Sequence, residues 1–228
     1  MKFKMRSTIT KRFALLLLLP LLVGSLACFA PSVEVVDRPL RSAPIAGNPY
    51  AMHFTHFLTD TSVLEIGEVL PITVASDPYG VFEDLDEGYL LELGSFSSRM
   101  KARYESVDSS GGIHQGVESM DLLTLDRVSE EQYEEYTTAF GTDRAIVQRV
   151  SVPSDWFSGD RGSITVHTSF TYTVKNSQAS TEPTEGAYSC ECVIYYIRER
   201  NRIVLFDDGV AYHAYPYEPE DPKGNVYY

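Results

Sequence analysis

The sequence predicts an all-β protein: an antiparallel β-sandwich, loosely immunoglobulin-like, with one short surface helix. Many short runs are rich in β-branched and aromatic residues, and turn-forming residues separate them. The clearest run, 164–175, alternates apolar and polar side chains with a period of two, interrupted only by Thr168. Such alternation is typical of a strand with one buried and one wet face. The Cys–Trp–Cys pattern of true immunoglobulin domains is missing, so the likeness concerns architecture alone.

The first half of the domain contains five expected strands. They cover residues 52–58, 69–76, 89–93, 100–107 and 120–128. Pro71 cannot donate a ladder hydrogen bond, which indicates an edge strand or the start of a strand. The glycine- and serine-rich stretch 108–112 predicts a loop.

One segment, 129–141, has the features of a short helix. Ser129 and Gln132 have the spacing of a capping box. Four glutamates follow in the first turns, where the helix dipole favours negative charge, and Gly141 is suited to end the helix. Its apolar side is thin, so we expect a surface helix that packs through Tyr133, Tyr136 and Phe140.

The second half alternates strands and turns more regularly. After the strand at 164–175 we expect a polar loop at 176–186, a strand at 188–197, a charged turn at 198–202 and a strand at 203–206. The sequence Asp-Asp-Gly at 207–209 predicts a hairpin before 210–213. Trp156 lies in an expected turn between the sheets, where it more simply fills the edge of the core than binds a ligand.

The first 28 residues have the order of an export signal. Five basic and no acidic residues stand among the first twelve, and an apolar run, 13–24, follows. Small residues then lead to Cys28. A cationic start, an apolar run and a small-residue end predict export of the mature chain from the cytoplasm.

The segment Ser25-Leu26-Ala27-Cys28 resembles the lipobox of bacterial lipoprotein precursors. Ala27 fits that pattern, whereas Leu26 departs from it, because the large aliphatic residue usually stands three positions before the cysteine. The resemblance implies that Cys28 receives lipid and anchors the protein to a membrane. Two alternatives stay open: cleavage after Ala27 with free secretion, and an uncleaved apolar anchor over 13–30, which approaches the roughly 18–20 residues of a membrane span.

The expected domain plan follows from these features. Residues 1–28 are the signal peptide with its lipobox-like end, and the prolines of 29–49 predict an extended tether. Residues 50–214 form the sandwich, and 215–228 form an irregular tail.

The charge of the chain argues against nucleic acid as a partner. The formal net charge is −13, and the leader holds five basic and no acidic residues, so the mature part carries −18. A phosphate backbone requires clustered Lys and Arg. The expected partners are the membrane, through the N-terminal lipid or anchor, and a protein or polysaccharide of the cell envelope.

Cys190 and Cys192 form the sharpest chemical motif. On an extended strand both sulfurs point to the same face, with Cα atoms about 6.6 Å apart. A disulfide brings its Cβ atoms to about 4 Å, so a bridge requires a bulge or turn. Three alternatives stay open: two core thiols packed with Tyr188, Ile194 and Tyr196, a strained local disulfide, or a redox or metal role.

Other candidate sites are weaker. His53 and His56 point to opposite faces of a strand, which prevents joint metal ligation, and His167 belongs to a wet face. The acidic loop 83–88 has oxygen ligands suited to calcium but not the order of an EF-hand, so a solvated turn is the simpler interpretation. We expect no metal and no cofactor.

Sequence motifs of catalysis are missing: neither a Gly-x-Ser-x-Gly elbow nor a His-Glu-x-x-His pair occurs. The leading hypothesis is therefore a membrane-anchored extracytoplasmic β-sandwich with a binding or structural role. An envelope hydrolase, or a thiol redox or metal protein that uses Cys190 and Cys192, are the alternatives.

Overall fold

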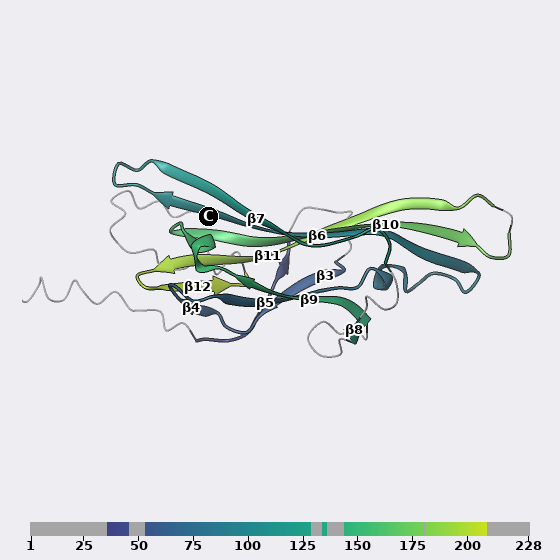
Figure 1. Cartoon of the computed structure of the whole chain (residues 1–228), viewed down its shortest axis with the longest axis horizontal. Helices are drawn as coiled ribbons and strands as arrows, with labels where there is room; N and C mark the ends of the chain where they lie inside the picture. Colours follow the sequence, from purple (N-terminus) through teal and green to yellow (C-terminus); the bar gives the residue numbers. More distant parts are fainter. Residues whose placement is uncertain (1–35, 46–52, 129–133, 136–143, 180, 209–228) are drawn as a thin grey trace, which may run out of the picture. The chain divides into compact units, whose positions relative to one another are not determined.

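Two antiparallel β-sheets make up the part of the chain that the computed structural model describes (Figure 1). The described residues are 36–45, 53–128, 134–135, 144–179 and 181–208. All of them belong to one structural unit, Val35–Tyr228. Buried side chains from both sheets share one core cluster, so the predicted all-β, sandwich-like architecture is confirmed.

The smaller sheet has five strands in the order β1-β3-β5-β9-β8. Their bounds are β1 Leu40–Arg41, β3 Thr55–Thr59, β5 Leu70–Ser76, β9 Arg144–Val152 and β8 Glu134–Glu135. Pro71 is the second residue of β5 and lies opposite Ser151 of β9, beyond the last residue paired with β3. The predicted strand start at Pro71 is therefore correct, although β5 lies inside the sheet.

The larger sheet has the order β4-β12-β11-β10-β6-β7, and β2 pairs with a separate stretch of β11. The bounds are β2 Ala43–Pro44, β4 Val63–Glu65, β6 Tyr89–Val107, β7 Ile113–Leu125, β10 Arg161–Asn176, β11 Thr184–Glu199 and β12 Arg202–Phe206. Two 3-10 turns, η1 Tyr79–Phe82 and η3 Ser154–Phe157, complete the described elements.

The long strands differ from the sequence-based expectation in their length. The stretches 89–93 and 100–107 were expected as two strands, but they form one continuous strand, β6, because β10 pairs with it from Glu105 to Tyr89. A register shift between Phe170 and Tyr172 absorbs an irregularity midway, where the Ser95 N–H donates to Thr171 Oγ1 at 2.8 Å. Pairing with β10 likewise extends β11 back to Thr184, into the stretch expected as a loop.

The predicted alternation along β10 is confirmed from Ile164 to Phe170, whereas residues 172–175 are all half-buried. Ile164, Val166 and Phe170 are buried on the core face, and the intervening residues are partly exposed. Thr168, the one polar interruption, is also fully buried, and its hydroxyl lies 3.1 Å from the hydroxyl of Ser98 on β6. Each hydroxyl thereby has a hydrogen-bonding partner within the core.

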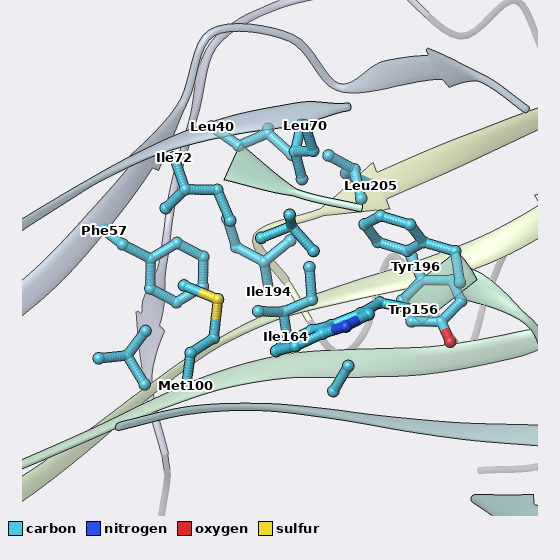
Figure 2. Close-up of a cluster of buried hydrophobic side chains, with 14 of the residues drawn as sticks. Leu40, Phe57, Leu70, Ile72, Met100, Trp156, Ile164, Ile194, Tyr196 and Leu205 are labelled. Carbon is cyan, nitrogen blue, oxygen red and sulfur yellow. The ribbon is translucent and has the colours of Figure 1, made fainter. Parts of the chain in front are cut away.

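The main core lies between the sheets, as Figure 2 shows for ten labelled side chains. Phe57 and Ile72 come from the smaller sheet, and Met100 and Ile164 from the larger. Trp156 and Phe157 enter from η3, which links β9 of one sheet to β10 of the other. Trp156 thus lies in a turn between the sheets and packs into the core, as expected.

Two expectations are wrong at the residues described. Glu134 and Glu135 were expected in the helix but form strand β8 opposite Ala145 and Arg144, because their backbone groups pair with β9 and not within a helix. The rest of the expected helix lies outside the described residues. The expected tether contributes β1 and β2 to the sheets, with Leu40 and Ser42 buried. The turn at residues 207–209 and the tail fall mostly outside the described part, as does the leader.

Within the described residues, no helix has the length and apolarity that a membrane crossing requires.

Candidate binding face

A regular polar surface among the described residues is the face of the larger sheet that points away from the core. We call it the outer face and define it by the alternate residues of β7, β6, β10 and β11 that do not enter the core. Along β6 these are Ser97, Arg99, Lys101, Arg103 and Glu105, each between buried or half-buried neighbours. The pairing register aligns them in rows with residues of the neighbouring strands.

One row consists entirely of charged or titratable side chains. It runs across four strands as Asp121, Arg99, His167 and Glu191. Arg99 Nε lies 2.6 Å from Asp121 Oδ1, and His167 Nδ1 lies 3.2 Å from Glu191 Oε1. All four side chains are 44–66% exposed, so the row contributes little to stability and mainly displays charge.

Hydroxyl groups accompany this charged row on both sides. On one side Thr124, Ser97, Ser169 and Ser189 align across the same four strands. On the other side Ser119 and Thr165 flank Lys101, and the next row aligns Val117, Arg103, Ser163 and Tyr195. Neighbouring strands lie about 4.8 Å apart, so the face offers hydrogen-bonding groups at a regular spacing.

Close packing on the opposite face holds these strands together. There Gly116, Tyr104, Gly162 and Tyr196 form one row, in which each tyrosine pairs with a glycine of the next strand. A Cβ on Gly116 would lie 2.0 Å from Tyr104 Cζ, so the ring occupies the space that the missing side chain leaves. Tyr196 is fully buried, and its ring meets Phe157 edge to face at 4.9 Å.

A second polar cluster organises the tip of the β6–β7 hairpin. The N–H and hydroxyl of Ser110 donate to Asp108 Oδ1 at 2.8 and 2.6 Å, and the Gly112 N–H donates to the same oxygen at 2.8 Å. His114 Nε2 lies 3.0 Å from Asp108 Oδ2. These hydrogen bonds, that of Ser110 first, lower the pKa of Asp108 from 3.8.

This Asp–Ser–His cluster has the wrong order for a nucleophilic triad. In a triad the histidine lies between the acid and the hydroxyl, which it deprotonates. Here Asp108 lies between Ser110 and His114, so the hydroxyl faces the carboxylate and not the imidazole. The His114 side chain is 68% exposed. The arrangement fits the ordering of a loop, which agrees with the loop expected at 108–112.

Cys190 and Cys192 are both free thiols on the core face of β11. Each is 1% exposed, and the Cys192 thiol donates to the Val166 carbonyl at 3.7 Å. Burial raises the pKa of Cys190, and it raises the pKa of Cys192 to about 12. Thiolates are the reactive form, so these two positions suit packing and not redox exchange.

The histidines and acidic loop do not assemble into a metal centre within the described residues. No three His, Cys, Asp or Glu side chains there come close enough together to hold an ion. His56 lies on β3, where burial, followed by the charge of Arg41, lowers its pKa from 6.5 to about 4. His53 precedes β3 and is exposed, and residues 83–88 form exposed turns.

Sequence reasoning recognised His167 as a residue of a wet face but missed its neighbours Asp121, Arg99 and Glu191. The missing information was the register, because all three residues lie on other strands, 24 or more positions from His167 in the sequence. A local signal did exist for β6: basic residues alternate with Met100 and Ala102, the period of a half-buried strand.

Comparison with known proteins adds no family to these observations. No protein-family model matches the sequence, and a search of curated proteins finds no similar one.

Proposed function

We propose that this chain is an exported protein, held at the outer side of a membrane through lipid on Cys28, that acts by binding a component of the cell envelope. The leader supports export, since a basic start and an apolar run precede Cys28. The acidic mature part, with its net charge of −18, suits a soluble domain at a crowded surface.

The outer face is the observation that favours binding over catalysis. It displays charged and hydroxyl side chains in register across four long strands, and strands position side chains more rigidly than loops. Of the groups considered for chemistry, Cys190 and Cys192 are in the core and His114 is at the hairpin tip, while His167 on the outer face is paired with Glu191. A polar surface on paired strands over a packed core is suited to recognition.

Expression of the full chain in a bacterium, followed by detergent phase separation and mass spectrometry, tests the anchoring. We expect the protein in the detergent phase, with the mass of lipid on an N-terminal Cys28 and without residues 1–27. Cys28→Ser is expected in the aqueous phase or retained as an unprocessed precursor lacking lipid. Recovery of unmodified Cys28 in a free mature protein would contradict lipidation, and an intact, unlipidated precursor in the cytosol would contradict export as well.

A further inference from the structure

We propose that Lys101 and Arg103 form an anion-binding step on the outer face and that its ligand is an anionic polysaccharide. This inference rests on the proposed envelope-binding function and specifies its ligand. The two residues occupy alternate positions of β6, so both side chains leave the same face of the sheet, with Cα atoms about 6.6 Å apart. Ala102 between them is fully buried in the core.

The position of these cations is fixed on both sides. β6 lies between β7 and β10, and Lys101 is opposite Ser119 on one and Thr165 on the other. Arg103 is exposed and lies opposite Val117 and Ser163. A backbone paired along both edges holds the two Cα positions at a fixed spacing, from which both side chains leave the same face.

The charges around this step are largely neutralised. On one side Arg99 pairs with Asp121 at 2.6 Å, and on the other Arg161 pairs with Glu105 at 3.2 Å. His167 Nδ1 lies 3.2 Å from Glu191 Oε1, an ion pair only when the histidine is protonated. Within the part of the chain that the structure describes, no carboxylate lies within 4 Å of the charged groups of Lys101 or Arg103. Two cations therefore remain available on the face of a strongly acidic protein.

The surrounding side chains favour a sugar polymer that carries carboxylates or phosphates. Ser119, Thr165 and Ser163 place hydroxyl groups in the same two rows as the cations, and Tyr195 continues the row of Arg103. Hydroxyls donate to and accept from sugar hydroxyls, while Lys and Arg bind the anionic substituents. A neutral glycan would use the hydroxyls but leave the two cations without a counter-charge.

An anionic membrane surface fits this face less well. Recognition of anionic lipid generally uses clusters of four to eight Lys or Arg, whereas two are available here. The net charge of −18 also repels an extended anionic surface. A single polymer chain touches the protein locally, and at physiological salt the Debye length of about 8 Å screens the more distant acidic groups.

The test uses the full chain in detergent micelles and affinity electrophoresis through gels that contain polygalacturonate, neutral dextran or no polymer. We expect retardation by polygalacturonate and none by dextran. The double variant Lys101→Ser/Arg103→Ser should weaken binding about 30-fold. This estimate takes about 1 kcal/mol for each unit-charge contact at 4 Å in water, and a factor of ten per 1.4 kcal/mol.

A matched control removes two cations elsewhere. Lys175→Ser/Arg127→Ser changes the net charge by the same amount, because it also removes two positive charges. Both of these residues pair with Glu92, away from the step. The control should bind polygalacturonate as the unmodified protein does. Thermal unfolding of both double variants near the unmodified temperature checks that neither change acts through folding.

Four outcomes overturn the inference. Equal weakening by the two double variants would mean that net charge alone governs binding. Equal retardation by dextran, or no retardation by either polymer, would remove the anionic polysaccharide, and selective binding to phosphatidylglycerol vesicles would assign the step to a membrane. Because lipidation of Cys28 is measured separately, a protein that is anchored but fails here contradicts only the ligand and not the anchoring.

Discussion

The replacement Gly162→Ala tests the tyrosine–glycine row most sharply. A Cβ at this position would lie 2.0 Å from the carbonyl oxygen of Arg103 and 2.6 Å from Tyr196 Oη. The first contact is with the backbone of β6, the strand paired with β10 on this side, so relief requires the two strands to separate. Tyr196 is fully buried and has no exit to solvent.

The expected loss of stability is large for a single methyl group. Overpacking of a core costs about 1–3 kcal/mol, and a clash with a paired backbone lies at or above the upper end of this range. With a melting-temperature change of about 2–4 °C per kcal/mol for a domain of this size, we expect a decrease of about 6–12 °C. The same change at Gly186 should cost about 1 kcal/mol, because its nearest neighbour is the hydroxyl of half-buried Tyr172, whose ring can move outward.

The fluorescence of Trp156 is a suitable assay for both variants. It is the single tryptophan of the chain and lies in the same core cluster as Tyr196. Exposure to water on unfolding shifts its emission to longer wavelength. An unfolding temperature of Gly162→Ala within 2 °C of the unmodified protein, or above that of Gly186→Ala, would refute the close approach of β6, β10 and β11 described here.

Other contacts give further measurable outcomes. Thr168→Val leaves the Ser98 hydroxyl in the core without its partner and should lower the free energy of unfolding in urea by about 1–3 kcal/mol. The double variant Thr168→Val/Ser98→Ala should lose less than the sum of the two single variants, and strict additivity would contradict the hydrogen bond. Asp108→Asn should lower the melting temperature at pH 7. Because the folded state lowers the pKa of Asp108, that difference should shrink as the pH falls below 3.8, and a constant difference would refute its origin. The pKa of His56 is lowered from 6.5 to about 4, so stability is highest above pH 6.5 and declines down to pH 4; His56→Gln should flatten this decline, and an NMR titration of His56 near pH 6.5 would contradict it. Because burial raises the pKa of Cys192 to about 12, a thiol reagent at pH 8 should label it only on unfolding, and labelling of the native protein would reopen the redox alternative.

Local patterns predicted the strands whose two faces meet different surroundings. Along β10 the alternation specified which side chains are buried as far as Phe170, because successive residues of a strand point to opposite faces. The reactivity of the Cys190 and Cys192 thiols was harder to judge from sequence. Their shared face was predicted correctly, but their state as free buried thiols depends on the core around them.

Segments without a strong pattern followed their partners instead of their own propensities. Glu134 and Glu135 have a helical context in sequence yet pair with β9, and residues 40–44 resemble a proline-punctuated spacer yet join both sheets. Backbone groups next to a strand edge gain hydrogen bonds there whatever their side chains prefer, which is why strand propensity depends on context. The local sequence of these residues carries no information about that strand edge, because the edge belongs to residues elsewhere in the chain.

The sequence by itself determined the charge of the mature part, the features of an export leader and the alternation that divides β10 into a dry and a wet face. Only the tertiary structure decided which residues of different strands stand side by side, because a register joins positions that are distant along the chain and shifting it by one residue would turn every side chain to the other face. The rows of Arg99 with His167, and of Lys101 with Thr165, exist for that reason.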